Sequence, residues 1–253
     1  MNNNIICSII MPSYNSEKYI SKSIESVLKQ TFTEFEFIII DDGSIDKSPQ
    51  IIKQYANKDM RIVFLQNIRN KGVAATRNEG IKISKGKYLA FIDCDDIWLP
   101  EKLEKQIKVL ETYNNIALVY SSYQIIDEQN RIIKNKVVPI TITFNQLLKE
   151  NIICLSSICF IKRLTDNNLM DSKYFHEDFC FLLNGLRCKF TYAGIEEILL
   201  KYRVSSDGRS HNKKNAAYYR WLIYRNFLKL NLLKSIYYFL WYFINGVKKY
   251  YLK

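Results

Sequence analysis

Glycine and proline, which interrupt regular secondary structure, are scarce in this sequence. Only 8 glycines and 4 prolines occur in 253 residues, which leaves little room for low-complexity linkers, and a hydrophobic fraction of 48% excludes a disordered or fibrous chain. The six cysteines include no CxxC pair and no cysteine/histidine metal cluster. We therefore expect one large α/β domain with an extension, whose thiols are small buried side chains in a reducing compartment.

Segments typical of secretion or of membrane crossing are also missing. Residues 1–5 lack the basic and long apolar regions of a signal peptide, so we expect a cytoplasmic protein. The charge-free stretch 235–247 is too short for the roughly 20 residues that span a bilayer. The sequence does carry a net charge of +12, which points to nucleic acid, an acidic membrane surface or a phosphorylated substrate as a partner.

Apolar runs alternate with amphipathic stretches in the first half of the chain, a pattern typical of βα units and a mainly parallel sheet. Ile20, Ile24 and Val27 recur at helical spacing, with Asn15 or Ser16 as the expected helix cap. The predicted strands cover 5–11, 35–41, 61–65, 87–93 and 116–120, and further helices cover 46–57, 73–84 and 100–113.

After residue 120 the alternation ends, which predicts a mixed sheet. Residues 123–126 and 131–134 flank a polar turn and read as a hairpin. The remaining expected elements are a strand at 156–161, a helix from about Asp178, and one or two strands within 190–204.

From about Asn212 the chain becomes basic and rich in aromatic residues. Lysine and arginine alternate there with tyrosine, tryptophan and phenylalanine, which predicts one or two helices. Two arrangements fit this extension of residues 212–253. It could lie on an anionic membrane surface, or it could form a helical hairpin packed on the main domain of residues 1–211.

Four polar segments follow predicted strands, where open α/β sheets bind their ligands. The first comprises residues 11–15, in which Tyr14 could cover a nucleotide base. Proline and asparagine are also ordinary turn residues, so this segment alone is weak evidence for a site.

The second segment ends an apolar strand in Asp41 and Asp42. A carboxylate here could accept hydrogen bonds from a base or a ribose, whereas the alternative is a helix cap at Ser44 or Asp46. Two acids at the end of a buried strand need a partner, which favours a ligand site.

The third segment, residues 67–80, joins a loop to a helix of small residues. Small side chains allow a ligand to approach the backbone, and Lys71 and Arg77 offer cations to a base or a phosphate. A close-packed helix explains the alanines of this segment but leaves Arg77 and Asn78 unexplained.

The fourth segment places Asp93, Asp95 and Asp96 directly after an apolar strand. Asp93 and Asp95 are two residues apart and face the same way in extended backbone. Crowded carboxylates repel one another unless a cation lies between them, and oxygen ligands suit Mg²⁺ or Mn²⁺. Such an ion could stabilise a departing diphosphate. A solvated acidic turn is the alternative.

In order and spacing, the four segments resemble the donor-binding half of family 2 glycosyltransferases, with Asp93-Cys94-Asp95 at the position of the family's DxD motif. The resemblance covers about residues 5–100 and returns at 176–205. It implies a GT-A fold, a nucleotide-sugar donor (usually a UDP-sugar), Mn²⁺ or Mg²⁺ as cofactor, and inversion at the anomeric carbon. Residues 1–100 would form the donor half of the domain and 101–211 the acceptor half.

The same resemblance assigns roles to individual residues. Asp93 and Asp95 would hold the metal. The residues expected to bind the donor are Pro12, Tyr14, Asn15, Glu17, Asp42, Lys71, Arg77, Asp93, Cys94 and Arg203.

Inverting transfer also needs a general base for the acceptor hydroxyl. His176-Glu177-Asp178-Phe179 resembles the family's Glu-Asp motif, so Asp178 is the expected base, with Glu177 as the second choice. An ionised Asp178 at a helix N-terminus would be favoured by the helix dipole, although it could equally cap the helix.

Farther along, Ser205 stands where many relatives have a histidine, which leaves a third metal ligand open. His211 lies nearby, and Arg203 or Arg209 could contact the diphosphate.

Other classes of protein fit less well. Residues 11–17 contain no glycine, unlike the phosphate loop of sugar-1-phosphate nucleotidyltransferases, and the basic residues follow no nucleic-acid recognition motif. A non-catalytic module would have no need for both acidic pairs. The sequence thus predicts an inverting glycosyltransferase that binds no nucleic acid and serves surface-polysaccharide synthesis (capsule, O-antigen or lipooligosaccharide). Its acceptor would be a saccharide or lipid-linked saccharide, met at the cytoplasmic face of the inner membrane with peripheral contact through 212–253.

Overall fold

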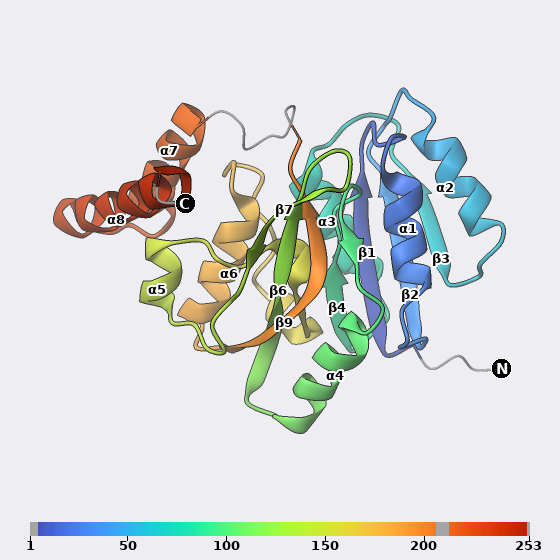
Figure 1. The fold of residues 1–253 in the computed structure, drawn as a ribbon, viewed down its shortest axis with the longest axis horizontal. Coiled ribbons are helices and arrows are strands. Elements are labelled where there is room, and N and C mark those ends of the chain that lie inside the picture. The colour runs from blue at the N-terminus through green and yellow to red at the C-terminus, as the bar shows by residue number, and fades with distance from the viewer. Residues whose placement is uncertain (1–4, 206–212, 252–253) are drawn as a thin grey trace.

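A mixed nine-stranded sheet forms the centre of the molecule (Figure 1), as seen in a computed structural model that describes residues 5–205 and 213–251. Eight strands follow the order β3-β2-β1-β4-β8-β6-β9-β5, and β7 pairs with β6 outside this path. The mixed sheet flanked by helices confirms the predicted architecture.

The first half of the chain builds the parallel part of the sheet, in which β1 pairs with β2 and β4, and β2 pairs with β3. The predicted strands and helices of this half are confirmed to within a few residues. The elements are β1 (Cys7–Ser13), α1 (Ile20–Leu28), β2 (Phe35–Asp41), α2 (Ser48–Ala56), β3 (Ile62–Gln66), α3 (Val73–Ile83) and β4 (Tyr88–Phe91).

The second half adds antiparallel pairs, and the predicted hairpin is confirmed between β6 and β7. Strand β6 runs beyond its predicted end because it continues from the core into this hairpin. The elements are β5 (Ile97–Trp98), α4 (Lys102–Thr112), β6 (Ile116–Ile126), β7 (Ile132–Lys136), α5 (Phe144–Lys149), β8 (Cys159–Ile161), α6 (Glu177–Arg187) and β9 (Thr191–Arg203).

Side chains of the central strands alternate between two hydrophobic clusters, one on each face of the sheet. In β1, Ile9 and Met11 join one cluster and Ile10 joins the other. This period of two is the ordinary geometry of a strand, and burial on both faces explains why these strands are apolar throughout. The strands that carry the polar loops are therefore buried on both faces.

Two predictions of local structure are wrong. Helix α1 begins at Ile20, and neither Asn15 nor Ser16 caps it. The Asn15 side chain instead accepts a hydrogen bond from the Ile45 amide at 3.0 Å, which joins the loop after β1 to the loop after β2. Cysteine burial is also incomplete: Cys188 is exposed, whereas Cys7 is among those that are buried.

Helices α7 (Lys213–Leu222) and α8 (Leu232–Tyr251) lie at the opposite end of the molecule from α2 and β3 (Figure 1). The segment that joins α7 to α8 packs on the domain. Its residues Ile223 and Tyr224 are fully buried, and the Tyr224 hydroxyl donates to the Leu148 carbonyl at 2.7 Å. In the described part of the chain, no helix combines the length and apolar character needed to cross a bilayer.

Candidate active site

Parallel pairing brings the ends of β1, β2 and β4 to one edge of the sheet. Ser13 is in register with Asp41, and Ile10 is in register with Phe91. Three of the four polar segments follow these strands directly, and the third segment, after β3, reaches the same edge through its hydrogen bonds to Asp42. The four segments are thus brought together as the sequence predicts.

The first loop is held by the second. The Asn15 amide donates to the Ser44 hydroxyl at 2.9 Å, and the Glu17 carboxylate accepts from the Lys47 amide at 3.0 Å. Tyr14 remains 48% exposed, so its ring is free to meet a flat ligand. Pro12 is buried within β1.

Asp42 organises the third segment. Its carboxylate accepts hydrogen bonds from the Asn67 side chain and from the amides of Lys71 and Gly72, at 2.9 to 3.0 Å. With 3% exposure it has little surface for a ligand, so its carboxylate serves to shape the loop that presents Lys71. The Lys71 ammonium donates to the Asn67 side chain at 2.7 Å and stays 46% exposed.

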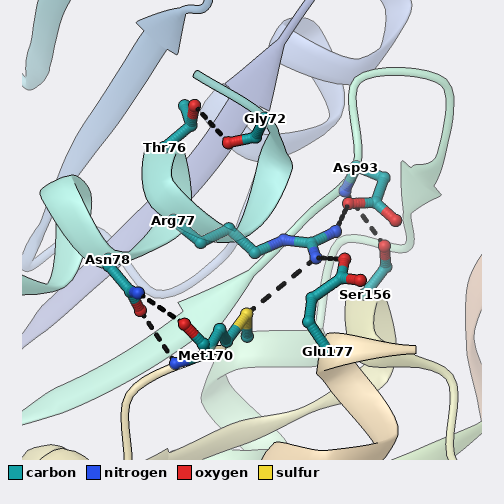
Figure 2. Close-up of polar contacts among 8 residues, drawn as sticks. All are labelled: Gly72, Thr76, Arg77, Asn78, Asp93, Ser156, Met170 and Glu177. Atoms are coloured by element: carbon teal, nitrogen blue, oxygen red, sulfur yellow. Dashed lines mark hydrogen bonds and ion pairs between the residues drawn. The ribbon is translucent and has the colours of Figure 1, made fainter. Parts of the chain in front are cut away.

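Arg77 occupies the centre of the site (Figure 2). Its guanidinium donates to the Asp93 carboxylate at 2.6 Å and to the Glu177 carboxylate at 3.0 Å, although the two acids are far apart in sequence. The Arg77 side chain is only 5% exposed. It therefore links the donor-side acids to the helix that carries the expected base, and a phosphate could not reach it without displacing these partners.

The acidic loop after β4, which contains the DxD motif and Asp96, turns its acids to two sides. Asp93 is 34% exposed and faces the site, whereas Asp96 is fully buried and accepts from the Arg203 amide at 2.9 Å. Burial and the neighbouring Asp93 raise the pKa of Asp95 to about 6, and burial and these two acids raise the pKa of the Cys94 thiol to about 12. Asp93 and Asp95 thus form the acidic pair of the site.

Glu177 and Asp178 open helix α6, whose remaining residues are anchored in the core by Phe179 and Leu182. The Glu177 side chain is 6% exposed and paired with Arg77, whereas Asp178 is half-buried. The cap residue of the helix is His176, so Asp178 lies in the first turn rather than at the cap.

The side chain of Arg203, at the end of β9, forms hydrogen bonds with other groups of the protein. Its guanidinium donates to the carbonyls of Asp95 and Asp127 and to the Asn130 side chain, at 2.7 to 2.9 Å. These bonds fix the DxD loop against the β6–β7 hairpin. Ser205 follows β9, and the two nearby candidates Arg209 and His211 lie outside the described residues.

Two residues of the site were not predicted from the sequence. The Ser156 hydroxyl accepts from the Asp93 amide at 3.0 Å, and the backbone of Met170 makes two hydrogen bonds with the Asn78 side chain, at 2.8 and 3.0 Å (Figure 2). Both lie in the region 121–175, which shows no motif. The serine pair within the apolar run 152–160 was the one available hint for Ser156.

A mixed α/β sheet with an acidic DxD loop beside a Glu-Asp helix defines a glycosyltransferase of the GT-A fold. The chain belongs to glycosyl transferase family 2, whose family model matches residues 8–168. A relative from Escherichia coli, UDP-Glc:alpha-D-GlcNAc-diphosphoundecaprenol beta-1,3-glucosyltransferase WfgD, is 37% identical over 96% of this chain and 94% of its own length. WfaP, a transferase of the same description from Escherichia coli, is 34% identical over 91% and 86%.

Solved structures share the fold. The S. aureus TarS fragment 1-349 in complex with UDP-GlcNAc superposes with a TM-score of 0.75 at 20% identity, over 97% of this chain and 73% of the other. The mannosyltransferase PcManGT from Pyrobaculum calidifontis, in complex with GDP-Man and Mn²⁺, gives a TM-score of 0.73 at 13% identity, over 92% and 69%. These likenesses confirm the GT-A fold.

Proposed function

We propose that this glycosyltransferase moves a sugar from a UDP-sugar to a lipid-linked saccharide, with inversion, during surface-polysaccharide synthesis. The observation that carries the proposal is Arg77, which joins Asp93 of the donor side to Glu177 beside the expected base. The names of WfgD and WfaP, which specify a UDP-Glc donor and a diphosphoundecaprenol-linked acceptor, support the choice of substrates.

The donor would lie along the carboxyl edge of the parallel strands. The exposed ring of Tyr14 would cover the uracil, and Lys71 would supply the exposed cation for the nucleotide. Asn15, Glu17, Asp42 and Arg203 would act by holding the loops in place, since their side chains already bind protein groups. Residues 1–100 would thus form the donor half.

A divalent cation, Mn²⁺ or Mg²⁺, fits the acidic pair. Among the described residues, no three acid, histidine or cysteine side chains converge on one point, so the protein alone does not form a complete cage. Mg²⁺ in particular is commonly held by one or two carboxylates together with substrate phosphates and water, which matches Asp93 and Asp95. The bound ion would neutralise the charge that develops on the departing diphosphate.

Asp178 would act as the base. Glu177 is buried and ion-paired with Arg77, which leaves the half-buried Asp178 as the carboxylate able to meet an acceptor. Asp178 would take the proton from the acceptor hydroxyl while that oxygen attacks the anomeric carbon. The bond from the anomeric carbon to the diphosphate oxygen would break on the opposite face, which inverts the configuration.

The test is nucleotide release from a panel of UDP-, GDP- and TDP-sugars, with an undecaprenyl-diphosphate-linked GlcNAc acceptor and with Mn²⁺, Mg²⁺ or chelator. We expect metal-dependent release from a UDP-sugar, lost in Asp95→Asn and in Asp178→Asn. Asp166→Asn, at an exposed position, is the matched control and should retain wild-type activity. Turnover of Asp178→Asn at the wild-type rate would refute the assignment of the base.

We also propose that the enzyme works at the cytoplasmic face of the inner membrane. Helix α8 exposes an apolar stripe that is repeated at helical spacing and is 42 to 79% exposed: Leu233, Ile236, Tyr237, Leu240, Phe243 and Ile244. Exposed Lys229 precedes this helix and exposed Lys234 lies in its first turn, and the net charge of the chain is +12, so an anionic surface complements it.

Point variants test the membrane contact better than truncation, because removing 212–253 would take away the buried Ile223 and Tyr224. Leu240→Glu combined with Phe243→Glu should abolish sedimentation with phosphatidylglycerol vesicles and leave UDP binding unchanged. Met60→Glu serves as control, because Met60 is fully exposed at the other end of the molecule. Unchanged vesicle binding by the double variant would rule out this surface.

A further inference from the structure

The C-terminal helices rest on the segment that carries the proposed base. The rings of Phe175 and Tyr219 stack with centroids 4.9 Å apart and an interplanar angle of 15°. Tyr174 meets Phe227 edge to face at 5.2 Å. Helix α7 and the turn after it therefore form one wall behind the start of helix α6.

Arg220 is the buried cation of this wall. It is 5% exposed, and its guanidinium carbon lies 3.6 Å from the ring centroid of Phe179 and 5.1 Å from that of Tyr242. Nε and Nη1 of Arg220 are buried and find no hydrogen-bond acceptor among the described residues. In the part of the chain that the structure describes, Arg220 is thus held against aromatic faces and pairs with no carboxylate, an expensive arrangement for a cation.

The contact between Arg220 and Phe179 lies next to the proposed base. Phe179 follows Asp178 directly, in the first turn of α6. On the other side of the same turn, Glu177 is fixed by Arg77. The base is therefore bracketed by two arginines, one from the donor half and one from the C-terminal extension, and each holds a neighbour of Asp178 in the sequence.

We propose that Arg220 is a positioning residue for Asp178, and that the C-terminal extension completes the acceptor side of the active site. This inference rests on the proposed function, because it takes Asp178 as the base. The stacked guanidinium fixes the Phe179 ring and with it the direction in which the Asp178 carboxylate points. A direct contact between Arg220 and an acceptor phosphate is disfavoured, because two of its three guanidinium nitrogens, Nε and Nη1, are buried.

Arg220→Met is the decisive variant, because methionine keeps a flexible chain on the two rings and removes both unsatisfied donors. A purely structural arginine would be replaced here without loss, since apolar substitutes for buried charges are often neutral or stabilising. We expect an unchanged or higher unfolding temperature, unchanged UDP affinity and acceptor KM, and a kcat lower by roughly 10- to 100-fold, the scale of a small misplacement of a catalytic group. Arg220→Lys should recover part of the kcat.

The matched control is Trp221→Leu, on the same helix, whose ring contacts Phe239 of α8 at 5.5 Å. It should lower the unfolding temperature and leave kcat unchanged. Full kcat in Arg220→Met would overturn the proposal. So would a rise in KM for a diphosphate-linked acceptor with normal kcat, since it would indicate a phosphate contact instead.

Hydrogen exchange provides a second readout that needs no turnover. The Cys180 amide donates to the His176 carbonyl at 3.1 Å and reports the first turn of α6. Its exchange should be faster in Arg220→Met and unchanged in Trp221→Leu. An inactive wild type would count against the proposed function alone, whereas equal Cys180 exchange in wild type and Arg220→Met would count against the positioning role.

Discussion

Replacing Arg77 by methionine removes the cation that two carboxylates share in the centre of the site. Glu177, with a side chain 6% exposed, would keep its charge in a buried place without that partner. Asp93 is 34% exposed, so water can replace the arginine there. Most of the destabilisation should therefore come from Glu177.

The expected loss is about 3–5 kcal/mol in the free energy of unfolding, the usual effect of removing one partner of a buried ion pair. Urea denaturation at pH 7 measures it directly. Arg131→Met is the matched control, because Arg131 forms an ion pair with Asp127 at 2.6 Å but is 76% exposed. Its loss should cost at most about 1 kcal/mol, as for other surface pairs.

The double variant Arg77→Met, Glu177→Met separates the ion pair from simple packing. With both partners gone, the Glu177 charge no longer has to be buried without Arg77, and most of the lost stability should return. Activity should stay low in both variants, because Asp93 and helix α6 are no longer linked. A cost for Arg77→Met as small as that for Arg131→Met, or a double variant weaker than the single one, would refute this reasoning.

Three further predictions concern other parts of the molecule. Gly43→Ala should cost about 1–3 kcal/mol in thermal unfolding and weaken UDP binding, because Gly43 has a φ of 75° and an added Cβ would lie 2.8 Å from the Arg69 carbonyl carbon. Burial lowers the pKa of Lys102 to about 8 from 10.5, so as the pH rises the folded protein loses the Lys102 proton before the unfolded chain does. The free energy of unfolding should therefore increase by about 2–3 kcal/mol between pH 8 and pH 10.5, and Lys102→Met should abolish this increase in urea titrations. Asp95→Asn should remove the Mn²⁺-dependent part of UDP affinity in calorimetry and leave the metal-independent part.

The candidate site could be predicted from the sequence because its residues are grouped locally. Each acidic or basic segment follows an apolar strand, and parallel strands end at the same edge, so alternation and spacing were enough to place Tyr14, Asp42 and Asp93 together. The Glu-Asp pair was identified by its resemblance to the family's motif at the start of a predicted apolar helix. Local order along the chain, together with the family resemblance of its motifs, thus decided the fold class and the candidate residues.

Only the tertiary structure decided how those residues are used. Arg77 and Arg203 are cations in the sequence and looked like phosphate ligands, yet folding gives each a set of protein acceptors, and the sequence cannot show which partner a long side chain reaches. Arg220 and Ser156 were not predicted, because their partners Phe179 and Asp93 are distant in sequence. Burial and pairing depend on contacts between segments, and these exist only once the sheet and its helices have packed.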